Sequence, residues 1–229
     1  MKNLLLIPTM LLAACATTGG GGSKGSTAPF QGQDAVTKRH NEISNATKTA
    51  NDDCLKSMKV TDGFHGAMFS VTTDAAGKLS IETLRWTGPE AAKQCIVGES
   101  SKVTVTPLPG PSVSSTWEWN PPGEKAPAVV MPPDLETKVQ SLQTQSQAAV
   151  ESCEQQNLPP EMPADISVAF LVDAQGKTHG PTVLSSTAKD GGFDGCVQKV
   201  ILGLQFPPSD VQVPYPVTLR FHVGRLEKL

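Results

Sequence analysis

The side chains of this chain that could most readily do chemistry are its five cysteines and four histidines. They are Cys15, Cys54, Cys95, Cys153 and Cys196, together with His40, His65, His179 and His222. Zinc sites usually draw on cysteines or histidines that lie within a few residues of one another. No such spacing occurs here, so a zinc site is disfavoured and no metal is expected. The histidines are instead expected at the surface.

Other catalytic constellations are incomplete in this sequence. The adjacent serines at 185–186 lack the glycine-flanked elbow of a hydrolase nucleophile, and no motif ties a histidine to them. The paired acids at 52–53, and Asp190 with Asp194, lie near expected helix ends, where carboxylates serve capping and solvation. No catalytic residue and no cofactor are predicted, and the protein is not expected to be an enzyme. An enzyme or a small-ligand binder on the same scaffold remains the alternative.

The chain contains the same unit twice. Asp173 follows Asp74 by 99 residues, and the same offset relates Cys54 to Cys153. It also relates Val36 to Leu135, Ile43 to Leu142 and Ala50 to Ala149. One offset that spans a helical face, a cysteine and a turn indicates an internal duplication.

Each copy centres on a β-hairpin, at residues 67–86 and 166–186. Apolar residues alternate along the strands, which is the period of a half-buried strand. The strands are joined by an Asp-x-x-Gly turn, at 74–77 and at 173–176. Aspartate can accept hydrogen bonds from its own backbone, and glycine can adopt positive φ. A change of phase after Ile81 predicts a bulge in the first hairpin.

Helices and a closing strand surround each hairpin. Copy one is expected to begin with a helix over 34–58, to continue after the hairpin with a short helix from Pro89, and to end in strand segments at Val103 and at Trp117. Copy two has a helix over 134–156 that Asp134 caps, a helix near Asp190, and a closing strand over 211–223. The sequence therefore predicts an α+β protein of two tandem small modules, each with an antiparallel sheet.

The N-terminus is typical of a bacterial lipoprotein. A lysine, a short apolar run and the tetrad at 12–15 (Leu-Ala-Ala-Cys) form a secretory signal whose end resembles a lipobox. The predicted organisation is a signal peptide at 1–14, lipidated Cys15 with a Gly/Ser-rich tether at 15–33, module 1 at 34–119, a Pro-rich linker at 120–133 and module 2 at 134–229. The alternative is an ordinary signal peptide in which Cys15 is incidental.

Charge excludes one class of partner. The net charge is −3, with 19 Lys and Arg against 22 Asp and Glu. No long-range field would attract nucleic acid, so no nucleic-acid partner is expected. Ala16 follows the cysteine where inner-membrane retention would usually show aspartate. By resemblance to that sorting rule, we expect an outer-membrane anchor, with the protein mostly facing the periplasm.

Four cysteines remain once Cys15 is assigned to lipid, and four cysteines allow three pairings. The repeat favours pairing within copies, because Cys54 and Cys95 occupy the same places in copy one as Cys153 and Cys196 in copy two. An exported location favours oxidation, and each bridge would contribute about 3 to 4 kcal/mol in the chain-entropy model.

The order of motifs in copy two resembles the TonB-like C-terminal domain of the AgmX/PglI type. The matching elements are Cys153, residues 168–172, the turn and lysine at 173–177, residues 193–196, the Phe-Pro-Pro at 206–208 and residues 219–221. Copy one matches weakly. The resemblance implies a periplasmic α+β module that binds protein partners, in some cases by offering a sheet edge. Energy transduction is not implied, because a lipid anchor replaces the inner-membrane helix of the classical transducers.

These observations predict a non-catalytic, lipid-anchored docking protein of a cell-envelope machine. Pro214 and Pro216 require an unpaired ladder side, so the closing strand is expected at a sheet edge. Thr218, Arg220 and His222 are the predicted partner-binding residues, flanking an incoming strand. Another element of the same chain could instead cover this edge. A structural cell-wall lipoprotein is a further alternative, and the identity of the envelope partner is not predicted.

Overall fold

The structure is a computed structural model that describes residues 33–57, 66–74, 76–107, 113–119, 127–160, 162–188 and 190–224. The predicted signal peptide, Cys15 and nearly all of the tether lie outside the described residues, as does His65.

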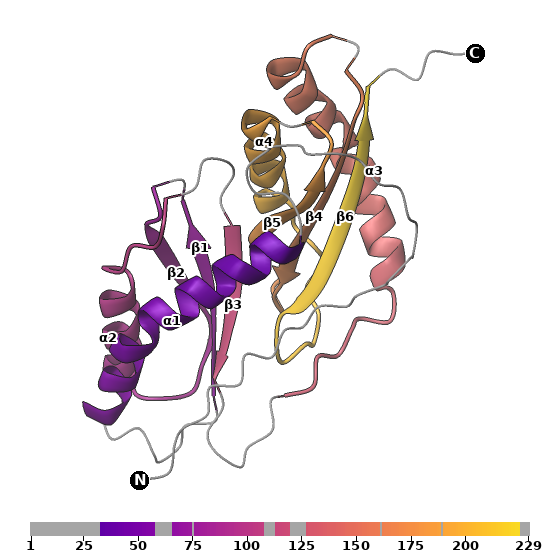
Figure 1. Cartoon of the computed structure of the whole chain (residues 1–229). Coiled ribbons are helices and arrows are strands. Elements are labelled where there is room, and N and C mark those ends of the chain that lie inside the picture. Colours follow the sequence, from indigo (N-terminus) through magenta and orange to yellow (C-terminus); the bar gives the residue numbers. More distant parts are fainter. Residues whose placement is uncertain are drawn as a thin grey trace.

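The described part of the chain folds into two α+β modules of the same design (Figure 1). Module 1 contains α1 (Gln33–Ser57), β1 (Ala67–Thr73), β2 (Leu79–Trp86), α2 (Glu90–Ser100) and β3 (Val113–Trp119). Module 2 contains α3 (Leu135–Asn157), β4 (Ala164–Val172), β5 (Thr178–Ser186), α4 (Gly191–Leu202) and β6 (Tyr215–Val223). The predicted fold class is confirmed.

Each module has a three-stranded antiparallel sheet with the first hairpin strand at its centre. The order is β2-β1-β3 in module 1 and β5-β4-β6 in module 2. The two helices of a module pack against each other and against the same sheet. The closing strand β6 is therefore an edge strand, as its prolines predict.

The hairpin turns form through the chemistry that their sequences predict. Asp74 Oδ1 accepts hydrogen bonds from the backbone N–H groups of Ala76 and Lys78, both at 2.9 Å. Asp173 Oδ1 does the same for Gln175 and Lys177. The turn glycines of both hairpins, at 77 and 176, have φ of 79° and 80°, a region that residues with a Cβ rarely adopt.

The predicted bulge is present in the first hairpin. Met68 lies opposite Arg85, whereas the next residue of β1, Phe69, lies opposite Thr83. Leu84 is therefore the extra residue. The bulge allows apolar residues on both sides of it to face the core despite the change of phase along β2.

The core of each module lies between its sheet and its helices. In β4 the even-numbered residues from Ile166 to Val172 are buried and alternate with more exposed residues. A disulfide joins the two helices of each module, Cys54 to Cys95 and Cys153 to Cys196, at sequence separations of 41 and 43. The prediction of pairing within copies is confirmed.

The prediction that Asp134 caps α3 was wrong. Asp134 occupies the N-cap position of α3, but its side chain makes no capping bond. Its carboxylate instead contacts Lys138 Nζ at 2.9 Å, because its backbone is not in the extended conformation that aims a side chain at the helix N–H groups. Asp190, which is extended, does cap α4, with Oδ1 accepting from the N–H groups of Gly192 and Phe193.

The bounds of the closing strands also differ from the prediction. β6 starts at Tyr215, four residues after Val211. In module 1 the segment predicted at Val103 contributes only a single bridge, between Thr104 and Lys78, whereas the segment predicted at Trp117 is part of β3, which begins earlier, at Val113. In these segments, the alternation of apolar residues correctly indicated which side chains are buried. It did not indicate where backbone pairing begins, because that depends on the partner strand.

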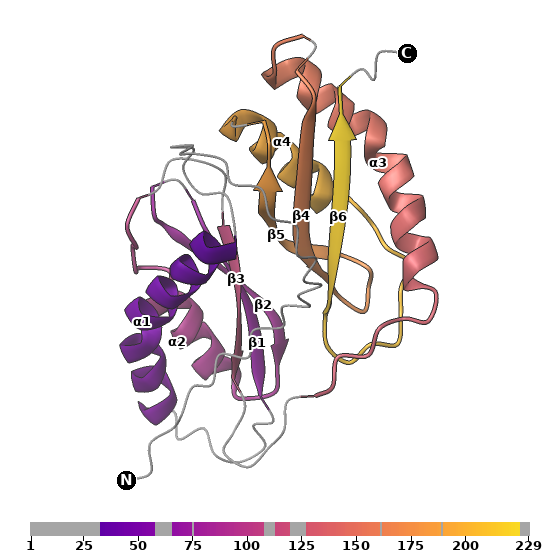
Figure 2. The same ribbon diagram turned by 45° about the vertical axis from the view of Figure 1, so that its right-hand side comes forward.

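The two modules are in contact. The outer face of the module 1 sheet, opposite its helices, packs against β5 of module 2, and β3 and β5 lie side by side in Figure 2. Ser70, on this outer face, is only 3% exposed. Both faces of β1 are thus buried, one by its own helices and one by the second module.

Candidate functional site

The contact between the modules is centred on a histidine. His179 of β5 is 4% exposed and lies between two carboxylates. Its Nδ1 is 2.8 Å from Glu82 Oε2 of module 1, and its Nε2 is 2.7 Å from Asp173 Oδ2 of module 2. The prediction that His179 is a surface histidine was wrong, because its outward face on β5 is covered by the first module.

The carboxylates that flank His179 are held in their ionised forms. Burial opposes the ionisation of Glu82, but hydrogen bonds from Lys177 and His179 outweigh it, so that the pKa of Glu82 lies below 4.5. Burial likewise opposes the ionisation of Asp173, and the hydrogen bonds from His179 and from the Lys177 backbone keep its pKa below 3.8. The side-chain ammonium of Lys177 contacts Glu82 at 2.8 Å. His179, Glu82, Asp173 and Lys177 thus form a cluster that links the two modules and places a charge on each side of their boundary. We call this cluster the joint.

A close backbone contact completes the joint. Gly180 has φ of 57°, and a Cβ there would lie 2.7 Å from Ser70 Oγ. Thr182 Oγ1 donates to the carbonyl of Ser114 at 3.1 Å and accepts from the Ser114 N–H at 3.0 Å. Module 2 thus hydrogen-bonds the outer edge of β3, so part of that edge is already engaged.

The outer edge of β6 presents backbone groups that β4 does not use. Asp165 of β4, opposite His222, directs its N–H and C=O to Thr187, on the other side of β4. The pair of Asp165 and His222 is therefore not hydrogen-bonded across the ladder. Because antiparallel ladders alternate, Thr218 and Arg220 also direct their N–H and C=O groups outward.

The predicted partner-binding residues lie along this edge, and all three are exposed. No strand pairs with the outer edge of β6 in the described part of the chain. The carbonyl of His222 accepts a hydrogen bond from Gln147 Nε2 of α3 at 3.0 Å, and its Nδ1 is 2.7 Å from Asp165 Oδ1. No described residue hydrogen-bonds the outward backbone groups of Thr218 and Arg220, while the carbonyl of His222 at the end of this edge is capped by a side chain.

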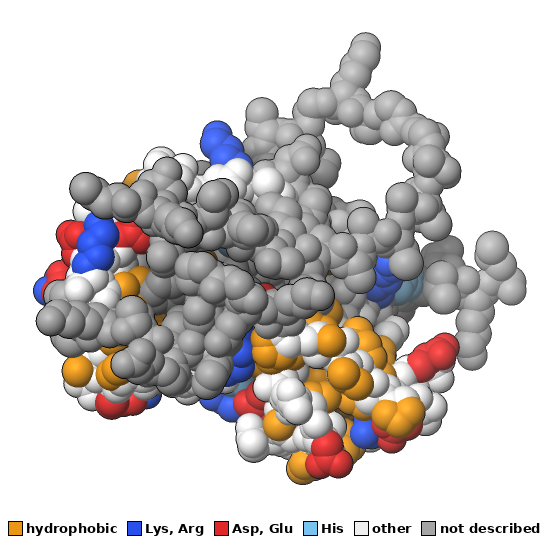
Figure 3. All heavy atoms as spheres, turned by 90° about the horizontal axis from the view of Figure 1, so that it is seen from below, with side chains coloured by type: hydrophobic (Ala, Val, Ile, Leu, Met, Phe, Trp, Pro, Cys, Tyr) orange, Lys and Arg blue, Asp and Glu red, His pale blue; other side chains and the backbone are white. Residues whose placement is uncertain are grey.

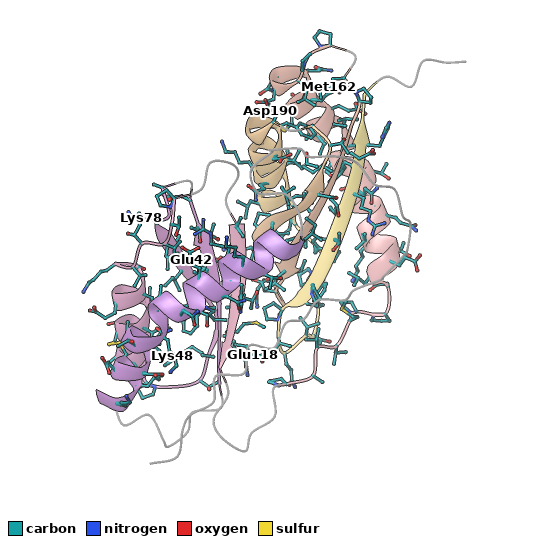
Figure 4. The ribbon with its side chains drawn as sticks, in the orientation of Figure 1. Glu42, Lys48, Lys78, Glu118, Met162 and Asp190 are labelled. Carbon is teal, nitrogen blue, oxygen red and sulfur yellow. A yellow bond between two sulfur atoms is a disulfide. The ribbon has the colours of Figure 1, made fainter. Side chains whose placement is uncertain are left out.

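A cavity lies between α1 and β3 in module 1. It has about 50 Å³ of free space, more than one water molecule needs. The buried side chains of Phe69 and Ile96 line its deep side. Lys48 and Glu118, labelled in Figure 4 on α1 and β3, lie on the two sides of this space. The sequence patterns did not indicate a cavity here.

The charged groups around the cavity are paired or neutral. Lys48 Nζ contacts Asp52 Oδ2 at 2.6 Å, and Glu118 Oε1 contacts Arg85 at 3.5 Å. Burial lowers the pKa of His40 below 6.5, so its imidazole is neutral at pH 7. His40, predicted to be a surface residue, is half-buried and lines the cavity.

Two ring nitrogens of cavity-lining residues have no hydrogen-bond partner among the described residues. They are Nε2 of His40 and Nε1 of Trp117, and both atoms are buried. A buried polar group without a partner typically costs about 1 to 3 kcal/mol of stability. Such groups therefore require an explanation in terms of packing or function.

Module 2 provides an internal comparison for this cavity. Helices α1 and α3 have the same register, since Thr47 and Ser146, 99 residues apart, each donate a hydroxyl hydrogen bond to the carbonyl four residues earlier. The positions of His40 and Asn51 in α1 then correspond to valines at 139 and 150 in α3. Val150 is fully buried in the core of module 2, and Val139 packs against the same core.

The strand residue that lines the cavity is also more polar than its counterpart in module 2. In the sheet of module 1, Trp117 lies opposite Phe69. In the sheet of module 2, Leu219 lies opposite Val168, which follows Phe69 by 99 residues, so Leu219 is the counterpart of Trp117. Leu219 is fully buried. Three positions that are aliphatic in module 2 are thus polar or heteroaromatic around the cavity in module 1.

The remaining candidate residues are not assembled into a reactive site. In the part of the chain that the structure describes, no three His, Cys, Asp or Glu side chains come together as metal ligands. Likewise, none of the helices among those residues has the length and apolar character needed to cross a membrane. Asp52 pairs with Lys48, and Asp190 caps α4, where Figure 4 labels it.

Comparison with family models, with curated proteins and with solved structures gave no match.

Proposed function

We propose that this protein is a non-catalytic lipoprotein, anchored through Cys15 in the outer membrane, whose second module docks a protein partner of a cell-envelope machine at the outer edge of β6. The observation that carries the proposal is the open backbone edge at Thr218 and Arg220. An extended segment of the partner would add a fourth strand there, with affinity from main-chain hydrogen bonds and selectivity from the exposed side chains of Thr218, Arg220 and His222. The resemblance to TonB-like modules is in keeping with this mode of binding.

The two closing strands differ in a way that supports module 2 as the docking module. In module 1 the edge of β3 at Ser114 is already hydrogen-bonded by Thr182. On β6 the corresponding position is Pro216, which has no N–H and limits self-association without blocking the residues that follow. Among the described residues, the edge of β6 from Thr218 onward thus offers successive outward backbone groups, whereas on β3 the second module already engages Ser114.

Exposed apolar surface also supports docking. Val130 and Met131, in the segment that precedes α3, are 64% and 45% exposed. Hydrophobic side chains gather on one area of the described surface in the view from below (Figure 3). Apolar areas of this kind often contact other macromolecules.

The docking edge can be tested with two variants at one position. Arg220→Pro removes the outward N–H, and β6 already holds a proline on the same side, at Pro216. Arg220→Ala keeps the N–H and removes only the side chain. Envelope partners enriched by crosslinking with the parent protein should be lost with the proline variant and largely kept with the alanine variant.

Amide hydrogen exchange gives the decisive measurement. The amides of residues 218, 220 and 222, which point away from β4, should exchange readily in the isolated protein and gain protection when the purified crosslinked partner is added. Full protection in the isolated protein, or no gain with the partner, would show that this edge does not dock. Enrichment of peptidoglycan alone would favour the structural cell-wall role.

The anchor is tested separately. Cys15→Ser should abolish labelling by a fatty-acid probe, because only that cysteine follows the apolar run of the signal. A variant that labels as strongly as the parent would overturn the lipid assignment while leaving the docking edge untouched.

A further inference from the structure

We propose that the joint is a pH-sensitive switch, which holds the two modules together while His179 carries a proton on both ring nitrogens and releases them as the ring loses one. Separation of the modules exposes the edge of β3 at Ser114, which the second module covers. The switch lies on β5, whereas the docking edge lies on β6, at the opposite edge of the module 2 sheet (Figure 2). Its action therefore does not depend on the docking partner.

His179 must supply both of the protons that bridge it to the carboxylates. Nδ1 is 2.8 Å from Glu82 Oε2, and Nε2 is 2.7 Å from Asp173 Oδ2. An ionised carboxylate only accepts hydrogen bonds, so each contact requires an N–H of the ring. Although burial opposes their ionisation, hydrogen bonds keep the pKa of Glu82 and of Asp173 below the ordinary values, so both carboxyls are ionised at neutral pH. Both contacts are therefore hydrogen bonds only when the imidazole is protonated.

The other oxygens of the two carboxylates have partners of their own. Glu82 Oε1 accepts a hydrogen bond from Lys177 Nζ at 2.8 Å. Asp173 Oδ1 accepts from the turn N–H groups of Gln175 and Lys177. Neither carboxylate can turn away from His179 without giving up one of these bonds. The acceptors on the two sides of the ring are thus fixed in place.

Loss of one proton from His179 removes a hydrogen bond and adds a repulsion. A neutral imidazole has a single N–H, and its other nitrogen carries a lone pair. That lone pair would face a carboxylate oxygen, also an acceptor, at 2.7 or 2.8 Å. Because His179 is 4% exposed, little water can enter to separate the two acceptors. Deprotonation therefore favours separation of the modules.

The other groups of module 1 that face β5 are uncharged or paired. Gly180 of β5 packs against Ser70 and Ser114, both uncharged. Arg85 and Glu118 lie opposite the same residue of β1, on the face of the sheet that Ser70 shares, and they contact each other at 3.5 Å. Lys78 precedes β2 and is exposed, so solvent screens its charge.

Within module 2, the neighbour of His179 in β4 is Leu171, which is uncharged. Helix α4 carries Asp194 and Lys199, but it covers the other face of β5. Thr178 points to that face, since its Oγ1 donates to the carbonyl of α4 residue 201 at 2.8 Å, and successive side chains of a strand point to opposite faces. The protons that bridge the modules are therefore those of His179.

Separation of the modules frees backbone groups of β3. The Ser114 N–H donates to Thr182 Oγ1 at 3.0 Å, and the Ser114 carbonyl accepts from the same hydroxyl at 3.1 Å. Ser114 is 9% exposed in the closed arrangement. Both bonds break when β5 leaves, so exchange of the Ser114 amide reports the opening of the joint.

The test is amide hydrogen exchange of the ¹⁵N-labelled full chain, followed by NMR from about pH 6 to about pH 9 and corrected for base catalysis. Protection at Ser114 should fall about tenfold or more, as expected when a hydrogen bond to a charged group is lost. The fall should coincide with the titration of the His179 ring nitrogens, whose signals are identified by their absence in His179→Gln. The amides of Val71 and Val168, in the central strands, should stay protected, because each module remains folded.

Three variants separate the switch from other effects of pH. His179→Gln cannot titrate, so its protection at Ser114 should not change across the range. Glu82→Gln supplies an amide whose NH₂ can donate to a neutral imidazole, and it should reduce the alkaline loss. His222→Gln removes an exposed histidine bonded to Asp165, and it should behave as the parent does.

Each outcome supports or overturns the switch. Loss of protection at Ser114 that follows the His179 titration and is reduced in Glu82→Gln supports it. Constant protection in the parent overturns it, as does an equal loss in His179→Gln. A His179 ring with one unprotonated nitrogen while Ser114 is fully protected also overturns it. Docking at β6 is measured at residues 218, 220 and 222, so it succeeds or fails independently.

Discussion

Removing the His179 side chain should loosen the joint between the modules. His179→Ala deletes two charge-assisted hydrogen bonds, to Glu82 at 2.8 Å and to Asp173 at 2.7 Å, from a residue that is 4% exposed. The variant leaves two carboxylates facing an unfilled space at the boundary. We expect it to destabilise both modules.

The expected loss of stability follows from the hydrogen bonds that each carboxylate retains in the variant. Hydrogen bonds to charged groups are typically worth about 1.5 to 3 kcal/mol each. Glu82 retains Lys177 and has a side chain that is 45% exposed, so solvent screens its loss. Asp173 retains the turn N–H groups of Gln175 and Lys177. We therefore expect a total loss of about 2 to 3 kcal/mol, of which about 1 kcal/mol is coupling across the boundary.

Urea denaturation can separate these contributions, because all three tryptophans, at 86, 117 and 119, belong to module 1. Tryptophan fluorescence then reports module 1, and far-UV circular dichroism reports the whole chain. A loss of about 2 kcal/mol lowers the midpoint by about 1 M when the m value is about 2 kcal/mol/M. The double-mutant cycle with Glu82→Gln isolates the contribution across the boundary.

The control is His222→Ala, which removes an exposed histidine bonded to Asp165 and should change stability by less than about 0.5 kcal/mol. If His179→Ala leaves the fluorescence midpoint of module 1 unchanged, or if the cycle shows no coupling with Glu82, the modules are not joined through this histidine.

Three further perturbations address the joint and the modules. Replacing both Cys153 and Cys196 by alanine opens a bridge with a sequence separation of 43 and should lower the urea stability of module 2 by about 4 kcal/mol, whereas an effect near zero would contradict the chain-entropy account. Gly180→Ala places a Cβ in a left-handed conformation and against Ser70, so we expect a loss of about 2 kcal/mol by thermal denaturation. Acidification is expected to weaken the contact between the modules. Because the pKa values of Glu82 and Asp173 are lowered in the folded protein, their ionised carboxylates stabilise the fold above about pH 4.5 and pH 3.8. This stability is lost as the pH falls through the folded-state pKa values. Urea midpoints measured from neutral pH to acid should show this loss, and Glu82→Gln should reduce it.

Local features of the fold could be predicted because they depend on residues close together in the chain. The Asp-x-x-Gly turns at 74–77 and 173–176 need only their own side chains and glycine conformations. The disulfides followed from the repeat, since equivalent positions in two copies constrain each other. The bulge in the first hairpin was visible as a change of phase in apolar alternation.

The candidate sites could be predicted only in part from local sequence patterns. Strict alternation and prolines placed β6 at an edge, with Thr218, Arg220 and His222 exposed along it. The capping of the His222 carbonyl by Gln147 depends on how α3 lies against β6, and no local pattern encodes that. The cavity in module 1 had a signal that aligning the copies could have revealed, because His40 and Asn51 stand where the second copy has valines.

The sequence by itself determined the two modules, their covalent bridges, their turn chemistry and the strand that lies at an edge, because periodicity and duplication are properties of one segment at a time. The tertiary structure alone decided that His179 is buried, that Glu82 of one module lies 2.8 Å from it, and that a cavity separates α1 from β3. These features arise where two surfaces meet. Whether a polar strand residue faces water or a second module depends on the docking of elements far apart in the chain. The alternation of polar and apolar residues along the strand is the same in both cases.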